Sequence, residues 1–97
     1  MTDQGPHVAR KLRIHGRVQG VWYRAWSRQT AQQFGLRGWV RNRNDGTVEM
    51  LVQGAEDLVE RFIARSREGP PAARVERNDV EDSDEPAPEG FEGRPSA

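Results

Sequence analysis

The sequence predicts one small α+β domain in which two helices cover one face of an antiparallel sheet. Three observations lead to this fold class. Stretches typical of strands and two stretches with apolar residues at helical spacing follow one another in the order β-α-β-β-α-β. Glycine and proline mark most of the boundaries between them. Finally, 97 residues with 34% hydrophobic composition suffice for one core between one sheet and one helical layer.

The first strand and the first helix flank a glycine loop. Residues 8–15 mix apolar side chains with Arg and Lys and contain neither Gly nor Pro, which favours a strand. Residues 22–34 carry apolar or small side chains at helical spacing, and Gly35 suits the position just beyond the last helical turn. The loop between these two elements therefore leads directly into the start of a helix.

A β-hairpin is predicted after the first helix. Residues 36–43 alternate as a strand does, with Val40 on the core side and Trp39 on the other. Asn-Asp-Gly at 44–46 is a strong turn signal, and the apolar residues of 47–53 alternate inward. Two strands joined by a tight turn follow from this pattern.

The second half of the chain supplies another helix and weaker strands. Apolar residues at helical spacing predict a helix over 55–67, followed by the helix-stopping Gly-Pro-Pro at 69–71. Residues 74–81 are predicted to form a strand. The acidic, proline-bearing segment 83–90 is expected to be a loop or a mobile segment, and 91–94 a short edge strand.

This order of elements is the split βαβ or ferredoxin-like plan. We expect residues 8–94 to form the domain, with 1–7 and 95–97 as tails. The sheet face opposite the helices is expected to be open to water, which would expose Trp39. We also expect the first strand to lie beside the strand that ends at Asn42.

Composition excludes several classes of protein. Without cysteine the chain has no disulfide, no thiolate metal site and no cysteine nucleophile. No signal-peptide core and no stretch of membrane-spanning length are present, so we expect a cytoplasmic protein without a membrane partner. Net charge is zero, yet residues 1–44 hold nine Lys or Arg and one acidic residue. This imbalance suits a small anionic ligand, or equally a solvated surface whose two halves neutralise each other.

The glycine loop and the helix that follows it have the chemistry of an anion cradle. A loop of this shape turns several backbone N–H groups toward one point, and the helix start adds unpaired donors and the positive end of its dipole. Arg24, in the first helical turn, would complete the cradle through charge-assisted, bidentate hydrogen bonds. We therefore predict that the loop holds a phosphoryl group.

Asn42 lies at the end of a strand and points to the same side as core residues. Its amide offers both a donor and an acceptor, which suits holding a water in line with a phosphorus atom. An asparagine before Asn-Asp-Gly also serves as ordinary turn chemistry. Both interpretations of Asn42 stay open at this point.

Several stronger phosphate-handling sites are missing from the sequence. No P-loop signature and no cluster of metal ligands is present, and His15 at the loop entrance is either a nucleophile or a hydrogen-bonded bystander. What is left is a cradle, one arginine and one amide, without a general acid. Such a site expels a carboxylate most easily. The conjugate acid of a carboxylate has a pKa of about 4, so the carboxylate departs at neutral pH without taking up a proton. The chemistry points toward a mixed carboxylic-phosphoric anhydride.

Three segments of the sequence resemble the acylphosphatase family. They are residues 16–24 (GRVQGVWYR), 35–42 (GLRGWVRN) and 45–49 (DGTVE). The resemblance covers roughly residues 8–94. It implies a ferredoxin-like α/β sandwich that hydrolyses acyl phosphates to a carboxylate and phosphate, without metal, cofactor or covalent intermediate. Gly93 is a departure, since the family's closing strand usually has an aliphatic residue there.

The resemblance also implies the roles of particular residues. By position, Arg24 binds the phosphate and Asn42 positions the attacking water. A loose phosphoryl-transfer transition state needs mainly positioning and charge stabilisation, so two side chains are adequate. We expect a monomer whose partner is a small acyl phosphate. The cradle would be formed by the backbone amides of Gly16, Arg17, Val18, Gln19, Gly20 and Val21.

Two other functions remain as alternatives. A ferredoxin-like sheet with exposed aromatic and basic residues can bind single-stranded RNA, and Trp39 with Arg37, Arg41 and Arg43 is a candidate patch. The missing aromatic RNA-binding signature and the acidic second half argue against a nucleic-acid partner. The other alternative is a domain that binds phosphate, an acyl phosphate or carbamoyl phosphate without turnover, as part of a larger carbamoyl-transfer enzyme.

Overall fold

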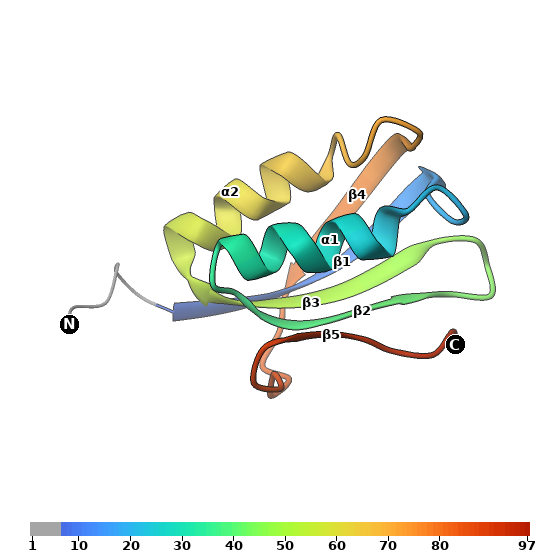
Figure 1. Cartoon of the computed structure of the whole chain (residues 1–97). Helices are drawn as coiled ribbons and strands as arrows, with labels where there is room; N and C mark the ends of the chain where they lie inside the picture. The colour runs from blue at the N-terminus through green and yellow to red at the C-terminus, as the bar shows by residue number, and fades with distance from the viewer. Residues whose placement is uncertain (1–6) are drawn as a thin grey trace.

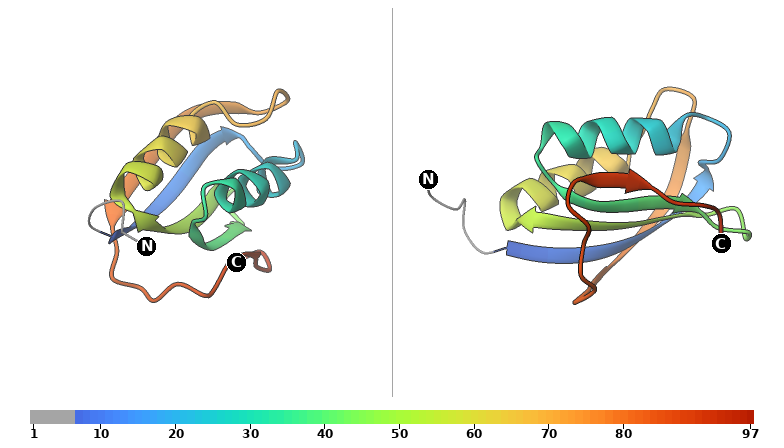
Figure 2. Two further views of the ribbon diagram at one scale, coloured as in Figure 1. Left: turned by 60° about the vertical axis from the view of Figure 1, so that its left-hand side comes forward. Right: turned by 60° about the horizontal axis from the view of Figure 1, so that its bottom comes forward.

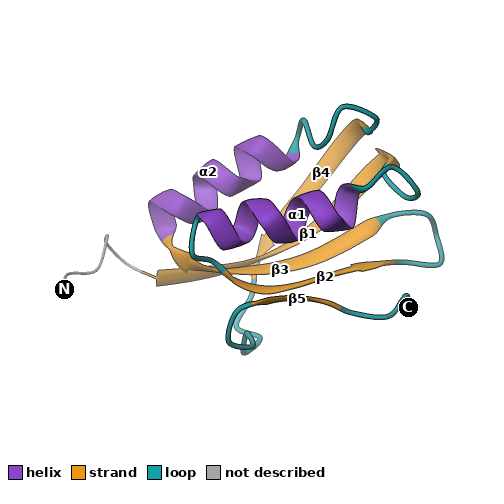
Figure 3. Cartoon of the chain, viewed as in Figure 1, coloured by secondary structure: helices purple, strands orange, loops and turns teal. Residues whose placement is uncertain are grey.

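Two helices pack on one face of a five-stranded sheet in the computed structural model, which describes residues 7–97 (Figures 1 and 3). The predicted order of strands and helices is confirmed, and most boundaries differ from the expected ones by one or two residues. The elements are β1 (His7–Arg17), α1 (Tyr23–Gln33), β2 (Arg37–Asn42), β3 (Val48–Ala55), α2 (Glu56–Ser66), β4 (Arg74–Asp82) and β5 (Phe91–Gly93).

The strands lie in the order β4-β1-β3-β2-β5. The first four pair antiparallel, as predicted, whereas β5 runs parallel to β2 with Gly38 opposite Phe91. The complete sheet is therefore mixed. Because β3 lies between β1 and β2, the expectation that the first strand lies beside the strand ending at Asn42 is wrong.

The structure describes the C-terminus to its last residue, whereas the description of the N-terminal segment begins at His7. Of the segment 1–7, only His7 is described, and it begins β1; residues 1–6 lie outside the described chain. Residues 95–97 continue alongside the end of β2. The Ala97 N–H donates to the Asn42 carbonyl at 3.0 Å, and the Asn44 N–H donates to the Ala97 carbonyl at 2.7 Å.

The core lies between the helices and the inner face of the sheet. Alternation along the strands directs Leu12 and Ile14 of β1 inward, opposite Met50 and Val48 of β3, and all four are fully buried. The helices are joined by a buried hydrogen bond, in which the Tyr23 hydroxyl donates to the Ser66 carbonyl at 2.6 Å. The other buried apolar members of this core are Val18, Val21, Ala31, Leu36, Val40, Val52, Val59, Phe62, Ile63 and Phe91.

The opposite face of the sheet is covered where it was expected to be open. The connection from β4 to β5 must travel from one side of the sheet to the other, and residues 83–90 cross below it, on the face away from the helices (Figure 2). Trp39 is only 1% exposed, and its indole N–H donates to Glu85 at 2.9 Å. The expectation that Trp39 is exposed is therefore wrong. Because the ring is buried, it also cannot serve as a stacking surface for RNA bases.

Cations surround the ring of Trp39. The Lys11 ammonium lies 5.4 Å from the ring centroid, and the guanidinium carbons of Arg41 and Arg94 lie at 4.9 Å. Lys11 also forms an ion pair with Glu85 at 2.9 Å. Residues 83–90, which were expected to be a loop or a mobile segment, are thus a loop that Glu85 holds against the sheet through Trp39 and Lys11.

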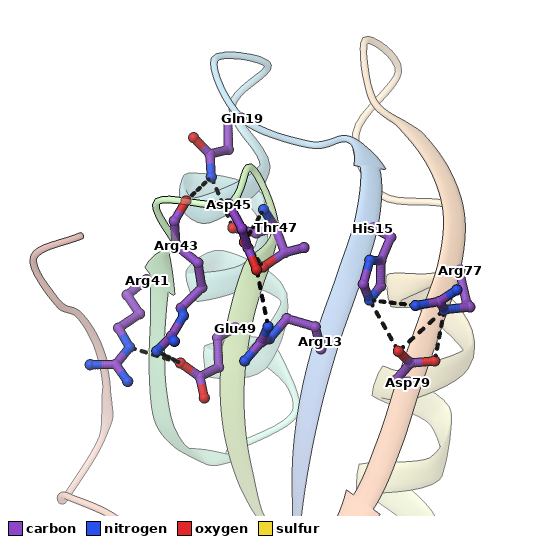
Figure 4. A network of polar contacts seen from close by, with 10 residues as sticks. All are labelled: Arg13, His15, Gln19, Arg41, Arg43, Asp45, Thr47, Glu49, Arg77 and Asp79. Carbon is purple, nitrogen blue, oxygen red and sulfur yellow. Dashed lines mark hydrogen bonds and ion pairs between the residues drawn. The ribbon is translucent and has the colours of Figure 1, made fainter. Parts of the chain in front are cut away.

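A buried carboxylate lies on the same face. Glu49 accepts hydrogen bonds from Arg41 Nε at 2.9 Å and Arg43 Nη1 at 3.2 Å (Figure 4). Lys11 Nζ is 3.8 Å from the Glu49 carboxylate. Burial by itself would raise the pKa of Glu49. The hydrogen bond from Arg41 and the three positive charges outweigh burial, so the pKa is lowered from its ordinary value of 4.5.

The lowered pKa of Glu49 predicts a loss of stability in acid. A carboxylate with a depressed folded-state pKa stabilises the fold above its unfolded pKa, and this contribution disappears as the pH falls through the folded pKa. Between about pH 5 and pH 3 the free energy of unfolding should therefore fall more in the parent protein than in Glu49→Gln. Urea titrations at several pH values measure this difference. Exposed Glu68, replaced by Gln, is the control and should follow the parent protein.

Gly16 has a conformation and a neighbour that exclude a side chain. Its φ is +127°, at a bulge where the pairing of β1 with β4 shifts register, and a Cβ there would overlap the Arg74 carbonyl oxygen. Gly46, at φ +93°, has no heavy atom near the position of a Cβ. Substitution at Gly46 therefore measures the cost of backbone strain alone, whereas substitution at Gly16 measures backbone strain together with steric overlap.

We expect Gly16→Ala to destabilise the protein far more than Gly46→Ala. The second change costs about 1 kcal/mol from the left-handed backbone alone, whereas the first adds a clash with the main chain of β4, for a total of about 3 kcal/mol or more. Denaturant midpoints of the two variants measure the difference. Equal midpoints would mean that β4 moves aside at no cost.

Candidate active site

A pocket of about 510 Å³ lies where four segments meet. These are the loop after β1, the first two turns of α1, the end of β2 and β5. Of the predicted site residues, Arg24, Asn42, Val18 and Gly20 line it. The structure therefore brings together the guanidinium, the amide and part of the glycine loop.

The other members of the predicted cradle do not line the pocket. Gly16 and Arg17 belong to β1, where they pair with Val75 and Arg74 of β4. Val21 is 7% exposed and packs in the core. These residues fix the two ends of the loop.

Gln19 fastens the loop to the rest of the sheet through its side chain. Its amide nitrogen donates to the carbonyl of Arg43 at 2.8 Å and to that of Thr47 at 2.9 Å (Figure 4). Arg43 follows β2 and Thr47 precedes β3, so the loop after β1 reaches across to the β2–β3 turn. This reach explains how Asn42 lines the same pocket although β2 does not neighbour β1.

The backbone amides of the loop and of the first helical turn have no protein acceptor. Within residues 7–97, no hydrogen bond joins an N–H of residues 18–25 to a backbone or side-chain oxygen. Helix α1 has no side-chain N-cap and no acidic residue in its first turn. The donors and the positive dipole end that such residues usually satisfy are thus left for a ligand.

Trp22 is a site residue that sequence reasoning missed. It precedes α1 with φ +69°, a left-handed conformation that is uncommon and strained in a bulky residue, and it is 80% exposed beside the pocket. Gly20, with φ +72°, adopts the same region without strain. A large aromatic residue between a glycine loop and a helix is the signal that could have drawn attention to it.

The Arg24 guanidinium and the Asn42 Oδ1 atom both lack a partner among residues 7–97. Arg24 is exposed at the first turn of α1 and forms no ion pair with any described residue. The Asn42 Oδ1 atom is buried without a hydrogen-bond partner. A buried unpaired acceptor is costly, so it marks a position where a water or a ligand donor belongs.

Arg28 and Gly93 also line the pocket and were not predicted to do so. Arg28 is four residues after Arg24, so the two side chains share a face of α1. Gly93 reaches the pocket because β5 pairs with β2. The helical spacing of the two arginines was visible in the sequence, whereas the place of Gly93 depends on the path of β5.

His15 lies elsewhere, on the face of the sheet opposite the helices. Its Nε2 atom is 3.0 Å from Asp79 Oδ2 and 3.2 Å from Arg77 Nη2 (Figure 4).

Among the described residues, no group of three or more His, Cys, Asp or Glu side chains is arranged to hold a metal ion. Across residues 7–97, neither helix has the length and apolar character needed to cross a membrane.

Comparison with known proteins agrees with this geometry. The family model for acylphosphatase matches residues 10–93. An acylphosphatase of Rhizorhabdus wittichii is 48% identical over 95 residues, which cover 98% of this chain and 96% of the relative.

Solved structures agree as well. An acylphosphatase from Coxiella burnetii has a TM-score of 0.88 at 29% identity, covering 97% of this chain and 99% of its own. Full-length HypF in a phosphate- and nucleotide-bound form has a TM-score of 0.87 at 29% identity, covering 99% of this chain but 12% of its own. The ferredoxin-like fold and the resemblance seen in the sequence are confirmed: the chain belongs to the acylphosphatase family of enzymes.

Proposed function

We propose that the protein hydrolyses acyl phosphates to a carboxylate and phosphate, without a metal ion, at the pocket between α1 and the end of β2. Membership of the acylphosphatase family supports the reaction class. The observation that carries the proposal is that the unpaired Arg24 guanidinium, the unpartnered Asn42 Oδ1 and the free loop amides adjoin one cavity. Positive charge and open donors on one side, and an acceptor on the other, suit a phosphoryl group with an attacking water.

The phosphoryl group is held by the loop and by Arg24. The backbone amides of Val18, Gly20 and Trp22, which line the pocket, donate to its oxygens at the positive end of the α1 dipole. The guanidinium of Arg24 adds charge-assisted hydrogen bonds to the same group. Because Gln19 and the buried Val18 and Val21 fix the loop before substrate arrives, little reorganisation is needed at the moment of reaction.

Asn42 positions the attacking water. Its Oδ1 accepts a hydrogen bond from the water and so directs the water's lone pair toward phosphorus, opposite the leaving carboxylate. The new P–O bond forms as the bond to the acyl oxygen breaks. The substrate dianion and water become a carboxylate and dihydrogen phosphate, with both protons of the water on the phosphate. No side chain has to accept or supply a proton, because the carboxylate leaves unprotonated.

A non-catalytic binding domain is the second candidate. The observation in its favour is the similarity to one part of HypF, a much longer chain solved in a phosphate-bound form. Such a domain would bind phosphate at the same cradle without turnover. Measurement of turnover beside phosphate affinity distinguishes the two functions.

We propose in addition that the enzyme is a cytoplasmic monomer. In support of the monomer, only Trp22 and Val80 are exposed large hydrophobic residues among those the structure describes, and scattered apolar residues of this kind are normal on a monomer's surface. Light scattering after size-exclusion chromatography measures the mass of the particle directly.

Replacement of Arg24 or Asn42 should abolish most activity and leave the fold intact. Removal of one preorganised donor from a developing charge typically lowers the rate by about 10²–10³-fold, so Arg24→Ala and Asn42→Ala should each lose at least that much in kcat/KM. Arg24→Lys should also be poor, since a point charge lacks the planar fork.

The matched control for these variants is Arg65→Ala. Arg65 is an exposed arginine in the last turn of α2 and does not line the pocket, so its removal should leave kcat/KM unchanged. Circular dichroism and denaturant midpoints check that each variant is folded. Folded Arg24→Ala with parental kcat/KM would contradict the proposed role of Arg24.

Hydrolysis of an aromatic acyl phosphate should proceed at full rate in excess EDTA. The proposed mechanism assigns every stabilising contact to protein groups, so chelation removes nothing from it. Phosphate release is measured with and without EDTA against the spontaneous rate. A rate that falls with EDTA and returns with an added divalent ion would contradict metal-independent hydrolysis, and release at the spontaneous rate would refute hydrolysis itself.

A further inference from the structure

Part of the pocket is not used by the proposed mechanism. Beyond Arg24 and Asn42, the cavity continues along the second turn of α1 to Arg28 and to Gly93 of β5. The Arg28 side chain is exposed and forms no ion pair or hydrogen bond with another described residue. The pocket therefore holds a second unpaired guanidinium on the side away from the glycine loop.

The backbone of β5 leaves room for this guanidinium. A Cβ atom at Gly93 would lie 3.6 Å from Arg28 Cδ and 3.9 Å from Arg28 Nη1. The arginine side chain thus passes over bare main chain, where any larger residue would touch it. A side chain at position 93 would narrow this end of the cavity.

The charge of α1 is unbalanced in the same region. Arg24 and Arg28 stand at i and i+4, a spacing at which like charges repel, and both lie in the first two turns, near the positive end of the helix dipole. The helix (YRAWSRQTAQQ) contains no acidic residue. An anion bound beside the two arginines would relieve this repulsion.

We propose that Arg28 binds a second anionic group of the substrate, on its acyl side. This inference rests on the proposed function and narrows it: the pocket prefers acyl phosphates whose acyl group carries a carboxylate or a phosphate. The phosphoryl group lies at the loop and Arg24, and the second anion lies one helical turn farther along α1. Gly93 provides the space for it.

The spacing selects the length of the acyl group. One turn of α1 rises about 5.4 Å, and i and i+4 side chains start about 5–6 Å apart. In succinyl phosphate, five bonds separate the phosphorus from the carbon of the free carboxylate, a comparable length. A planar guanidinium can bind that carboxylate through two parallel hydrogen bonds.

The test compares succinyl phosphate with butyryl phosphate, which has the same chain length and a methyl group in place of the carboxylate. For the parent enzyme, kcat/KM should be about tenfold higher with succinyl phosphate, through a lower KM. Arg28→Gln should lower kcat/KM with succinyl phosphate and bring the ratio of the two kcat/KM values close to one. Arg28→Lys should keep part of the preference, since it keeps the charge.

Two further variants complete the experiment. Arg65→Gln removes one charge from an exposed position on α2 and should leave the substrate preference intact. Gly93→Val should reduce the preference as Arg28→Gln does, because its branched side chain fills the space beside the guanidinium. The φ of Gly93 is not in the left-handed region, so the backbone tolerates the change.

The outcomes separate this inference from the proposed function. Turnover of both substrates without preference, or an equal effect of Arg28→Gln on both, overturns the role of Arg28 and leaves the acyl phosphate hydrolase standing. Absence of turnover with every acyl phosphate overturns both. A preference for succinyl phosphate that disappears in Arg28→Gln and persists in Arg65→Gln supports the inference.

Discussion

The site depends on the pair of hydrogen bonds from the Gln19 side chain. They join a loop that leaves β1 to carbonyls on both sides of the β2–β3 turn, across the end of an intervening strand. The side chains of Val18 and Val21, on either side of Gln19 in the loop, are buried. The side chains of the loop are anchored, and its main-chain N–H groups have no acceptor among residues 7–97. These N–H groups therefore stay available to bind an oxyanion.

The sheet supports this loop from two directions. On the helical side, Tyr23 joins the start of α1 to the end of α2. On the opposite side, residues 83–90 cross the sheet and are held by Glu85, which pairs with Lys11 and accepts from Trp39. That crossing delivers β5 to the free side of β2, where Gly93 forms one wall of the pocket.

Local patterns were enough to predict the strands and helices and to name Arg24 and Asn42. Both residues stand at the ends of elements with strong periodicity, and both line the pocket. Burial of Trp39 could not be predicted, because it depends on the path of an acidic segment that resembles a solvated loop. The use of Gln19 as an anchor was equally hidden, since its acceptors are more than twenty residues away in the chain.

The outer strands of the sheet have a consequence for self-association. An unpaired strand edge is a template for another chain unless it is short, charged or irregular. Here β5 has three residues, Gly90 precedes it, Gly93 ends it and a proline follows soon after it, while β4 carries acidic and basic side chains along its whole length. Neither edge strand is a long apolar strand with which another chain could pair. The fold therefore resists edge-to-edge aggregation even though its central strands contain several valines.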